Sequence, residues 1–184
     1  VEALRAAHTQ VSTTSYRNTP SRQSYPFSSD DVGTYKTVIM AVNAEINKDI
    51  HNTFGDYFFS NTYVIGQWFW ELEELPERYQ QSFELIDEIW APTLFIKGAI
   101  EKKAPPAVKV VHMPLPLVTP NVDHSITREK FGIIDGYAFL FTFDFMSVLK
   151  RKNALGLIDA YCDAFSPDDG AILVLKTING ERRL

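Results

Sequence analysis

Apolar and polar positions follow two alternating periods along the chain, and these predict a succession of strands and helices. Short apolar runs rich in β-branched residues, bounded by polar or turn-forming segments, are typical of buried strands. Such runs occupy residues 36–42, 62–66, 88–92, 108–115, 137–143 and 171–178. Amphipathic helical stretches separate most of these runs. Strands that alternate with helices indicate an α/β fold, a Rossmann-like parallel sheet with helices on both faces.

Each predicted helix carries one apolar stripe, and several have recognisable ends. The inward stripes are Ile46–Ile50–Phe54, Tyr79–Phe83–Ile86, Ile96–Ala99–Ile100 and, within residues 153–165, Leu155–Ile158–Cys162–Phe165. Gly55 is expected to end the first of these helices. Pro76 suits the first turn of the second, and Thr93 is expected to cap the third.

Three further segments bear on domain organisation. Residues 10–16 could form a short strand, and residues 17–34 are a loop rich in Ser, Pro, Asn and Asp. The prolines of residues 114–120, followed by a polar stretch, interrupt the alternation and predict a domain junction. We therefore expect an incomplete first domain at 1–120 and the start of a second at 121–184. Both ends look cut, which indicates a piece of a longer protein.

Composition narrows the class of protein. The 184 residues are 45% hydrophobic and 22% charged, as in ordinary globular domains. The net charge is −5, and lysines and arginines are spread along the chain, which argues against a general nucleic-acid surface. A single cysteine, Cys162, excludes an internal disulfide and suits a reducing cytosol. No signal-peptide pattern or apolar run of about 20 residues is present.

The motifs of several enzyme classes are absent from the sequence. It contains no G-x-G-x-x-G, Walker A, H-E-x-x-H, G-x-S-x-G or C-x-x-C pattern. It also lacks Asp-x-Asp, a carboxylate pair that could hold a divalent metal. We therefore favour chemistry without a metal.

Three adjacent cations, Lys150, Arg151 and Lys152, stand between the strand 137–143 and the helix 153–165. Cations at a helix N-terminus oppose the helix dipole, whereas anions are favoured there. A bound diphosphate would remove this conflict, since it accepts hydrogen bonds from backbone N–H groups, arginine and lysine together. A solvated loop that happens to be basic is the alternative, and placement alone leaves both open.

A second polar feature follows the strand 62–66, where Trp68, Phe69 and Trp70 precede Glu71. Aromatic rings can stack on a sugar, and a neighbouring carboxylate can accept hydrogen bonds from the hydroxyl groups of that sugar. We expect two of the three aromatic residues to be core. Glu71 is the candidate for a functional carboxylate, and the alternative is that it caps the helix beginning near Pro76.

The remaining aromatic, histidine and cysteine side chains favour structural roles. Trp90 and Phe95 are expected in the core, and His112 as a packed, hydrogen-bonded histidine. Cys162 is expected to be a small buried hydrophobe. His8, His51 and His124 lack the spacing of metal ligands.

Five segments together resemble the group 1 (family 4) retaining glycosyltransferases of GT-B architecture, particularly the bacterial enzymes of cell-surface saccharides. They are YVIGQWFWELEELPERY (63–79), DEIWAPTLF (87–95), HMPLPL (112–117), FLFTFDFMSVLKRKNALGLIDAY (139–161) and ILVLKT (172–177). The resemblance is collinear over residues 34–177. Its most specific part is the F-D-x-x-S…R-K-N run of residues 143–153.

The resemblance implies two Rossmann-like domains, with the nucleotide sugar held mainly by the C-terminal one and the acceptor by the N-terminal one. It implies that Arg151 and Lys152, with Ser147 and Asn153, hold the donor diphosphate. On the acceptor side, Glu71 is the catalytic candidate, and Trp68 and Trp70 are the candidates for stacking on a sugar. The substrates would be a nucleoside-diphosphate sugar and a saccharide or lipid-linked acceptor, with no other cofactor and no metal.

The chain also departs from this family. The N-terminal strand with a glycine-rich turn, the E-x7-E carboxylates and a cleft histidine have no counterpart, so we expect the piece itself to be inactive. The resemblance implies a cytoplasmic protein, with peripheral contact to the inner face of the membrane in the full-length form. A non-catalytic sugar- or nucleotide-binding module and a sugar-nucleotide epimerase of GT-B fold are the alternative functions.

Overall fold

The structure is a computed structural model that describes residues 1–18, 35–117, 119–133 and 135–180. Its contacts divide the chain into two compact units, residues 1–119 and residues 120–184. The boundary lies inside the proline-marked segment. Most of the expected loop at 17–34 lies outside the described residues.

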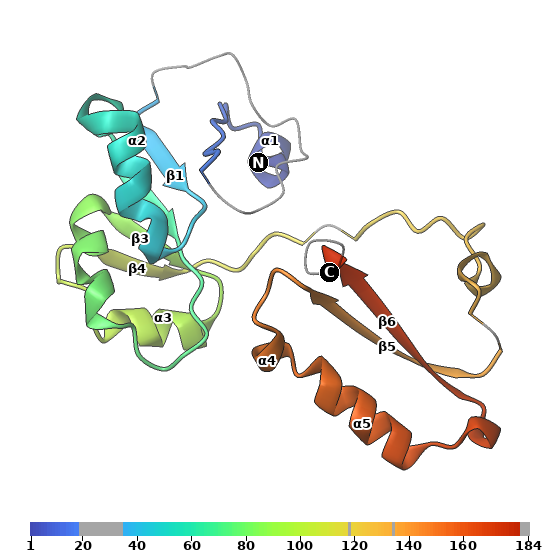
Figure 1. The fold of residues 1–184 in the computed structure, drawn as a ribbon. Helices are drawn as coiled ribbons and strands as arrows, with labels where there is room; N and C mark the ends of the chain where they lie inside the picture. Colours follow the sequence, from blue (N-terminus) through green and yellow to red (C-terminus); the bar gives the residue numbers. More distant parts are fainter. Residues whose placement is uncertain (19–34, 118, 134, 181–184) are drawn as a thin grey trace. The chain divides into compact units, whose positions relative to one another are not determined.

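Unit 1 is built on a parallel sheet of four strands (Figure 1). The strands are β1 (Thr37–Met40), β2 (Tyr63–Gln67), β3 (Glu88–Ala91) and β4 (Lys109–His112). Their order in the sheet follows the chain, and each pairs in parallel with the next. The prediction that these four runs are neighbouring parallel strands is confirmed.

The connections in unit 1 are helical. They comprise η1 (Ala44–Ile46) and α2 (Asn47–Phe59) after β1, η2 (Glu77–Leu85) after β2 and α3 (Leu94–Glu101) after β3; α1 (Glu2–Ala6) opens the chain. The expected cap of α3 is confirmed, because the Thr93 side chain accepts a hydrogen bond from Ile96 N at 3.2 Å. Residues 10–16 contain no strand, so that expectation is wrong.

Two predicted helix features of unit 1 are refined by the structure. Gly55 breaks the helix as expected, with a non-helical φ of 73° and ψ of 166°, but a further helical stretch follows this kink and ends at Phe59. One ring contact joins the parts on either side of Gly55, because the ring centroid of Phe58 lies 5.1 Å from that of Phe54. The segment after Pro76 is a 3₁₀ helix, η2, not an α-helix.

The main core cluster of unit 1 lies on one face of the sheet. Residues that pair across parallel strands point to the same side, and one such set joins the core cluster: Val38, Met40, Val64, Ile89, Ala91 and Val110. The same cluster contains Ile50 of α2, Phe83 of η2 and Ile100 of α3. Right-handed crossovers that all advance in one direction must lie on one face. These three connections therefore cover one face, where helices on both faces were predicted.

The opposite face carries a polar cluster centred on Glu88. Its carboxylate accepts hydrogen bonds from Trp90 Nε1 at 2.7 Å, from Tyr63 Oη at 3.0 Å and from Lys109 Nζ at 3.0 Å. Trp90, expected in the core, is only partly buried here. Burial raises the pKa of Glu88, but the hydrogen bonds from Trp90, Lys109 and Tyr63 outweigh it and hold that pKa below its usual value. Burial and the bond to Glu88 raise the pKa of Tyr63.

This cluster predicts an acid dependence of stability. A carboxyl group whose pKa is lowered by folding stabilises the native state above its unfolded pKa, and this stabilisation is lost as pH falls through the folded pKa. We expect the urea midpoint of unit 1 to fall more steeply in the native protein than in Glu88→Gln between about pH 5.5 and pH 3. Glu84→Gln, at an exposed carboxylate of η2, is the matched control and should follow the native curve. Equal slopes for the native protein and Glu88→Gln would contradict the expectation.

Unit 2 is a βαβ arrangement, as predicted. The strands β5 (Tyr137–Asp144) and β6 (Ala171–Ile178) pair in parallel over their whole length. Between them lie α4 (Leu149–Lys152), α5 (Ala154–Ala164) and η4 (Pro167–Asp169), and η3 (Arg128–Phe131) precedes β5. Figure 1 shows α5 running alongside the strand pair. The turn into β6 is held by hydrogen bonds between Ser166 and Asp169.

The inward stripe of α5 differs from the prediction. The Phe139 ring of β5 lies 6.2 Å from Tyr161 and 5.3 Å from Phe165. Leu155 is 77% exposed and Cys162 is exposed, although both were expected inside. The helix starts after a left-handed residue, and contact with the strand turns the Tyr161 side of the helix inward. The spacing of apolar residues in the sequence does not determine this rotation of α5 about its own axis.

Candidate functional site

The candidate site of unit 2 lies where its two parallel strands end. Asp144, the last residue of β5, pairs with Ile178, the last residue of β6. Loops that follow neighbouring parallel strands meet at one edge of the sheet, which is where α/β folds bind ligands. Residues 147–153, called the basic segment below, follow β5 at this edge.

The structure corrects the helix that was predicted to contain the basic triplet. Lys150, Arg151 and Lys152 form the last turn of the short helix α4. Cations are favoured at a helix C-terminus, so they do not oppose the dipole of the helix they belong to. The electrostatic conflict that suggested a diphosphate is therefore weaker than the sequence indicated. The triplet still ends one residue before the first turn of α5.

The other predicted residues of this site lie close to the triplet. Arg151 Nη2 donates to Ser147 Oγ at 3.3 Å. Asn153 has a left-handed backbone, with φ 52° and ψ 42°, and separates α4 from α5. A side chain at Gly156 would meet the Asn153 amide at 2.7 Å, so the glycine leaves room for that amide over the first turn of α5. Asn153 thus lies at the N-terminus of an eleven-residue helix, and the bonded pair Ser147 and Arg151 lies in the segment that leads into it.

The segment is positively charged and accessible. Lys150 and Arg151 are exposed, and Lys152 is partly buried. Within the part of the chain that the structure describes, neither Lys150 nor Lys152 takes part in an ion pair. Arginine and lysine side chains beside a helix N-terminus can bind an oxyanion through charge-assisted hydrogen bonds. This arrangement is suited to a phosphate-bearing ligand.

A hollow of about 410 Å³ lies at the same edge of unit 2. It is lined by Thr142, Phe143, Asp144, Lys176 and Ile178. Lys176 brings a further cation near the ends of the strands, although it was not among the predicted site residues. Its only signal in the sequence is a charged residue inside an otherwise apolar run.

In unit 1, Trp68 belongs to the core. Its side chain is 1% exposed, and its ring centroid lies 5.2 Å from that of Phe83. The fully buried Asn47 amide fits with its oxygen 3.2 Å from Trp68 Nε1 and its nitrogen 3.3 Å from the Asn43 carbonyl. Trp68 therefore offers no face to a sugar, and that expectation is wrong.

The next three residues stay near the surface at the carboxyl edge of unit 1. Phe69 is 41% exposed, and its backbone N donates to Asn43 Oδ1 at 2.9 Å. Trp70 is partly buried; its Nε1 donates to the Glu74 carbonyl at 2.7 Å, and its ring contacts Tyr79 edge-on. Glu71 is exposed. The sheet edge thus presents Phe69, part of Trp70 and Glu71.

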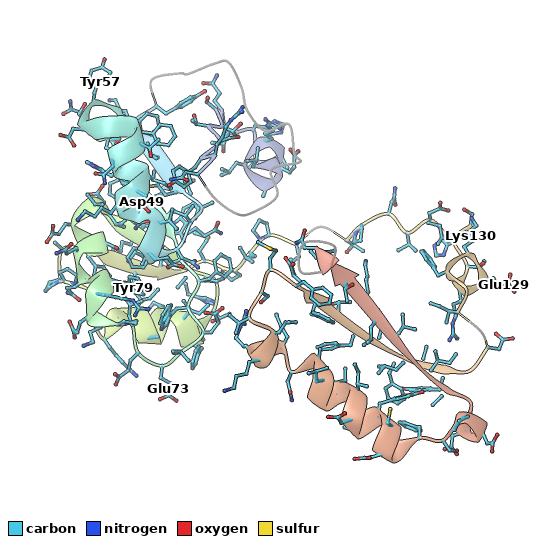
Figure 2. The ribbon with its side chains drawn as sticks, in the orientation of Figure 1. Asp49, Tyr57, Glu73, Tyr79, Glu129 and Lys130 are labelled. Atoms are coloured by element: carbon cyan, nitrogen blue, oxygen red, sulfur yellow. The ribbon has the colours of Figure 1, made fainter. Side chains whose placement is uncertain are left out.

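Other expectations in unit 1 are corrected by burial. Phe95, expected in the core, is exposed on α3, and so is His112 at the end of β4. Asn43 and Asn47 were missed, although both hold the segment that carries the aromatic residues. The signal was weak, because two asparagines after a strand usually indicate only a turn or helix start. Figure 2 shows Glu73 pointing away from the unit.

Three further findings concern similarity to known proteins, metal binding and membrane spans. No known protein family, curated protein or solved structure matches it. Among the described residues, no three His, Cys, Asp or Glu side chains gather closely enough to hold a metal ion. Over the same residues, every helix is too short or too polar to cross a membrane.

Proposed function

We propose that the protein is a glycosyltransferase whose unit 2 binds the diphosphate of a nucleoside-diphosphate sugar. The sugar would pass to a saccharide or lipid-linked acceptor, with retention at the transferred carbon and without a metal. Unit 1 would serve the acceptor, and Glu71 would orient its hydroxyl group. The family resemblance of residues 143–153 supplies the reaction class.

The basic segment carries this proposal. It combines three adjacent cations, the Ser147 hydroxyl group and the N-terminus of α5 at the ends of two parallel strands. A diphosphate needs this combination, because its charge and its acceptor oxygens must both be matched when water is removed. In retaining transfer, the same cations would stabilise the charge that develops on the departing diphosphate.

Lysine 152 provides the direct test. Replacing Lys152 by alanine should weaken binding of uridine or guanosine diphosphate by about 1.5–3 kcal/mol, the usual range for a charged hydrogen bond. The measurement is isothermal titration calorimetry on the whole chain.

Lys130→Ala is the matched control, because Lys130 is an exposed lysine of η3 in the same unit (Figure 2). It should leave the affinity unchanged. Equal affinities for the native protein and Lys152→Ala would mean that the basic segment is a solvated loop that binds no diphosphate. The proposal would then lose its support.

A binding module without catalysis is the second candidate. The polar side chains of the basic segment are cations, a hydroxyl group and an amide, which suit binding and supply no carboxylate for proton transfer. A transfer assay with labelled nucleotide sugars separates the two candidates. Binding without transfer to any saccharide or lipid-linked acceptor would favour the module, and release of sugar to water alone would favour an epimerase-like enzyme.

A further inference from the structure

The carboxylate of Asp144 joins the two loops at the carboxyl edge of unit 2. Its Oδ1 accepts a hydrogen bond from Met146 N at 2.8 Å and another from Asn179 Nδ2 at 2.8 Å. Its backbone carbonyl accepts from Ser147 N at 3.0 Å. One aspartate therefore contacts both the start of the loop after β5 and the first residue after β6.

The backbone conformation of Asn179 suits this contact. Its φ is 62°, a left-handed conformation that asparagine adopts more readily than most residues. Phe145 N donates to the Ile178 carbonyl at 3.1 Å, which continues the strand pairing up to the loops. Gly180 lies against Phe145, because a side chain built there would stand 3.5 Å from its ring. The two loops are thus attached by backbone, amide and ring contacts.

These contacts lead directly into the basic segment. Ser147 is positioned through its N–H by Asp144, and its hydroxyl group accepts the hydrogen bond from Arg151. The Asp144 carboxylate thus holds Met146 and Asn179, and its backbone carbonyl holds Ser147, whose hydroxyl group accepts from Arg151. Hydrogen bonds to a charged acceptor are about twice as strong as neutral ones, so the bonds from Met146 N and Asn179 Nδ2 to the carboxylate are the strongest attachments between the two loops.

We propose that Asp144 and Asn179 are positioning residues, which hold the basic segment in the conformation that binds a diphosphate. Neither needs to touch the ligand. The role rests on the proposed function, because it names the ligand of that same site. Its physical basis is preorganisation: a loop that is held in its binding conformation before the ligand arrives loses less conformational entropy on binding.

Asn179→Asp tests the role with little change in size. Aspartate also tolerates a left-handed backbone, but it replaces the amide donor by a carboxylate facing Asp144. If the binding conformation is then populated about one tenth of the time, the apparent Kd rises about tenfold. We expect this rise for uridine or guanosine diphosphate, together with faster hydrogen exchange at the Met146 and Ser147 amides measured by NMR.

Two further variants control for backbone strain and for charge. Asn61 also has a left-handed φ, 58°, but lies in unit 1, so Asn61→Asp should change neither quantity. Asp144→Asn combined with Asn179→Asp exchanges the amide and the carboxylate at constant net charge. This exchange can remake the hydrogen bond between the loops, and we expect it to recover most of the lost affinity. A residue needed only for general stability would not be rescued in this way.

The outcomes separate this inference from the proposed function. Unchanged affinity and unchanged exchange in Asn179→Asp would overturn the positioning role, even if the native protein binds diphosphate. Failure of the exchanged pair to restore affinity would also count against it. If the native protein binds neither diphosphate, the proposed function fails and so does the ligand named here. Faster amide exchange in Asn179→Asp would then still support the attachment between the two loops.

Discussion

Replacement of Trp68 by alanine is expected to lower the free energy of unfolding of unit 1 by about 3–5 kcal/mol. The indole is almost fully buried, contacts Phe83 and places its Nε1 next to the buried Asn47 amide. Its loss would leave a cavity and an amide without its partner, and each effect is destabilising. Urea unfolding measures this cost. All three tryptophans of the chain lie in unit 1, so fluorescence of the remaining two reports on this unit.

Trp70→Ala is the matched control for this prediction. Trp70 is only partly buried, so less apolar surface is returned to water and the cost should be clearly smaller. Equal costs for the two variants would contradict the assignment of Trp68 to the core. A Trp68→Ala protein of native stability that no longer binds saccharide would instead return Trp68 to the role of a sugar-stacking residue.

Ile89→Ala is expected to destabilise unit 1 by about 2–5 kcal/mol. Ile89 is 0% exposed on β3, an inner strand with β2 and β4 on either side, and belongs to the core cluster beneath the helices. A close-packed interior cannot collapse fully around the missing atoms, so a cavity penalty adds to the lost burial. The measurement is again the urea midpoint followed by tryptophan fluorescence.

Ile39→Ala makes the same chemical change on the opposite face of the sheet. Ile39 is 37% exposed on the edge strand β1, so we expect a much smaller loss of stability than at Ile89. The difference between the two variants tests whether the helices cover only one face of the sheet. Similar costs at the two positions would indicate that the second face is also packed.

The strands and their parallel pairing could be predicted from the sequence. Runs of apolar, β-branched residues separated by helical stretches leave few alternatives to a parallel sheet, because strands joined through helices must cross over. Thr93 was likewise predictable as a cap, since its side chain acts within one turn of the helix it begins. Both conclusions depend on interactions between residues close in the chain or on a repeated pattern.

The candidate site could be predicted only in part. Residues 147–153 are contiguous, so their gathering at one strand end follows from the chain itself. The partners Asp144 and Asn179 are 35 residues apart and meet only because β5 and β6 end in register. No local sequence pattern predicts such a pair. The sequence of the basic triplet likewise did not predict that it would form a separate short helix.

What the sequence alone determined was therefore the order and kind of most elements and the position of the basic segment. The tertiary structure decided which side of each element turns inward. Trp68 and Phe69 are neighbours of the same chemical class, yet the first fills the core and the second lies at the surface. Along α5, contact with Phe139 turns Tyr161 inward and leaves Leu155 and Cys162 outside. Tertiary packing determines which side chains are buried, because burial depends on contacts with residues that are distant in the chain. The spacing of apolar residues along the sequence does not identify those partners.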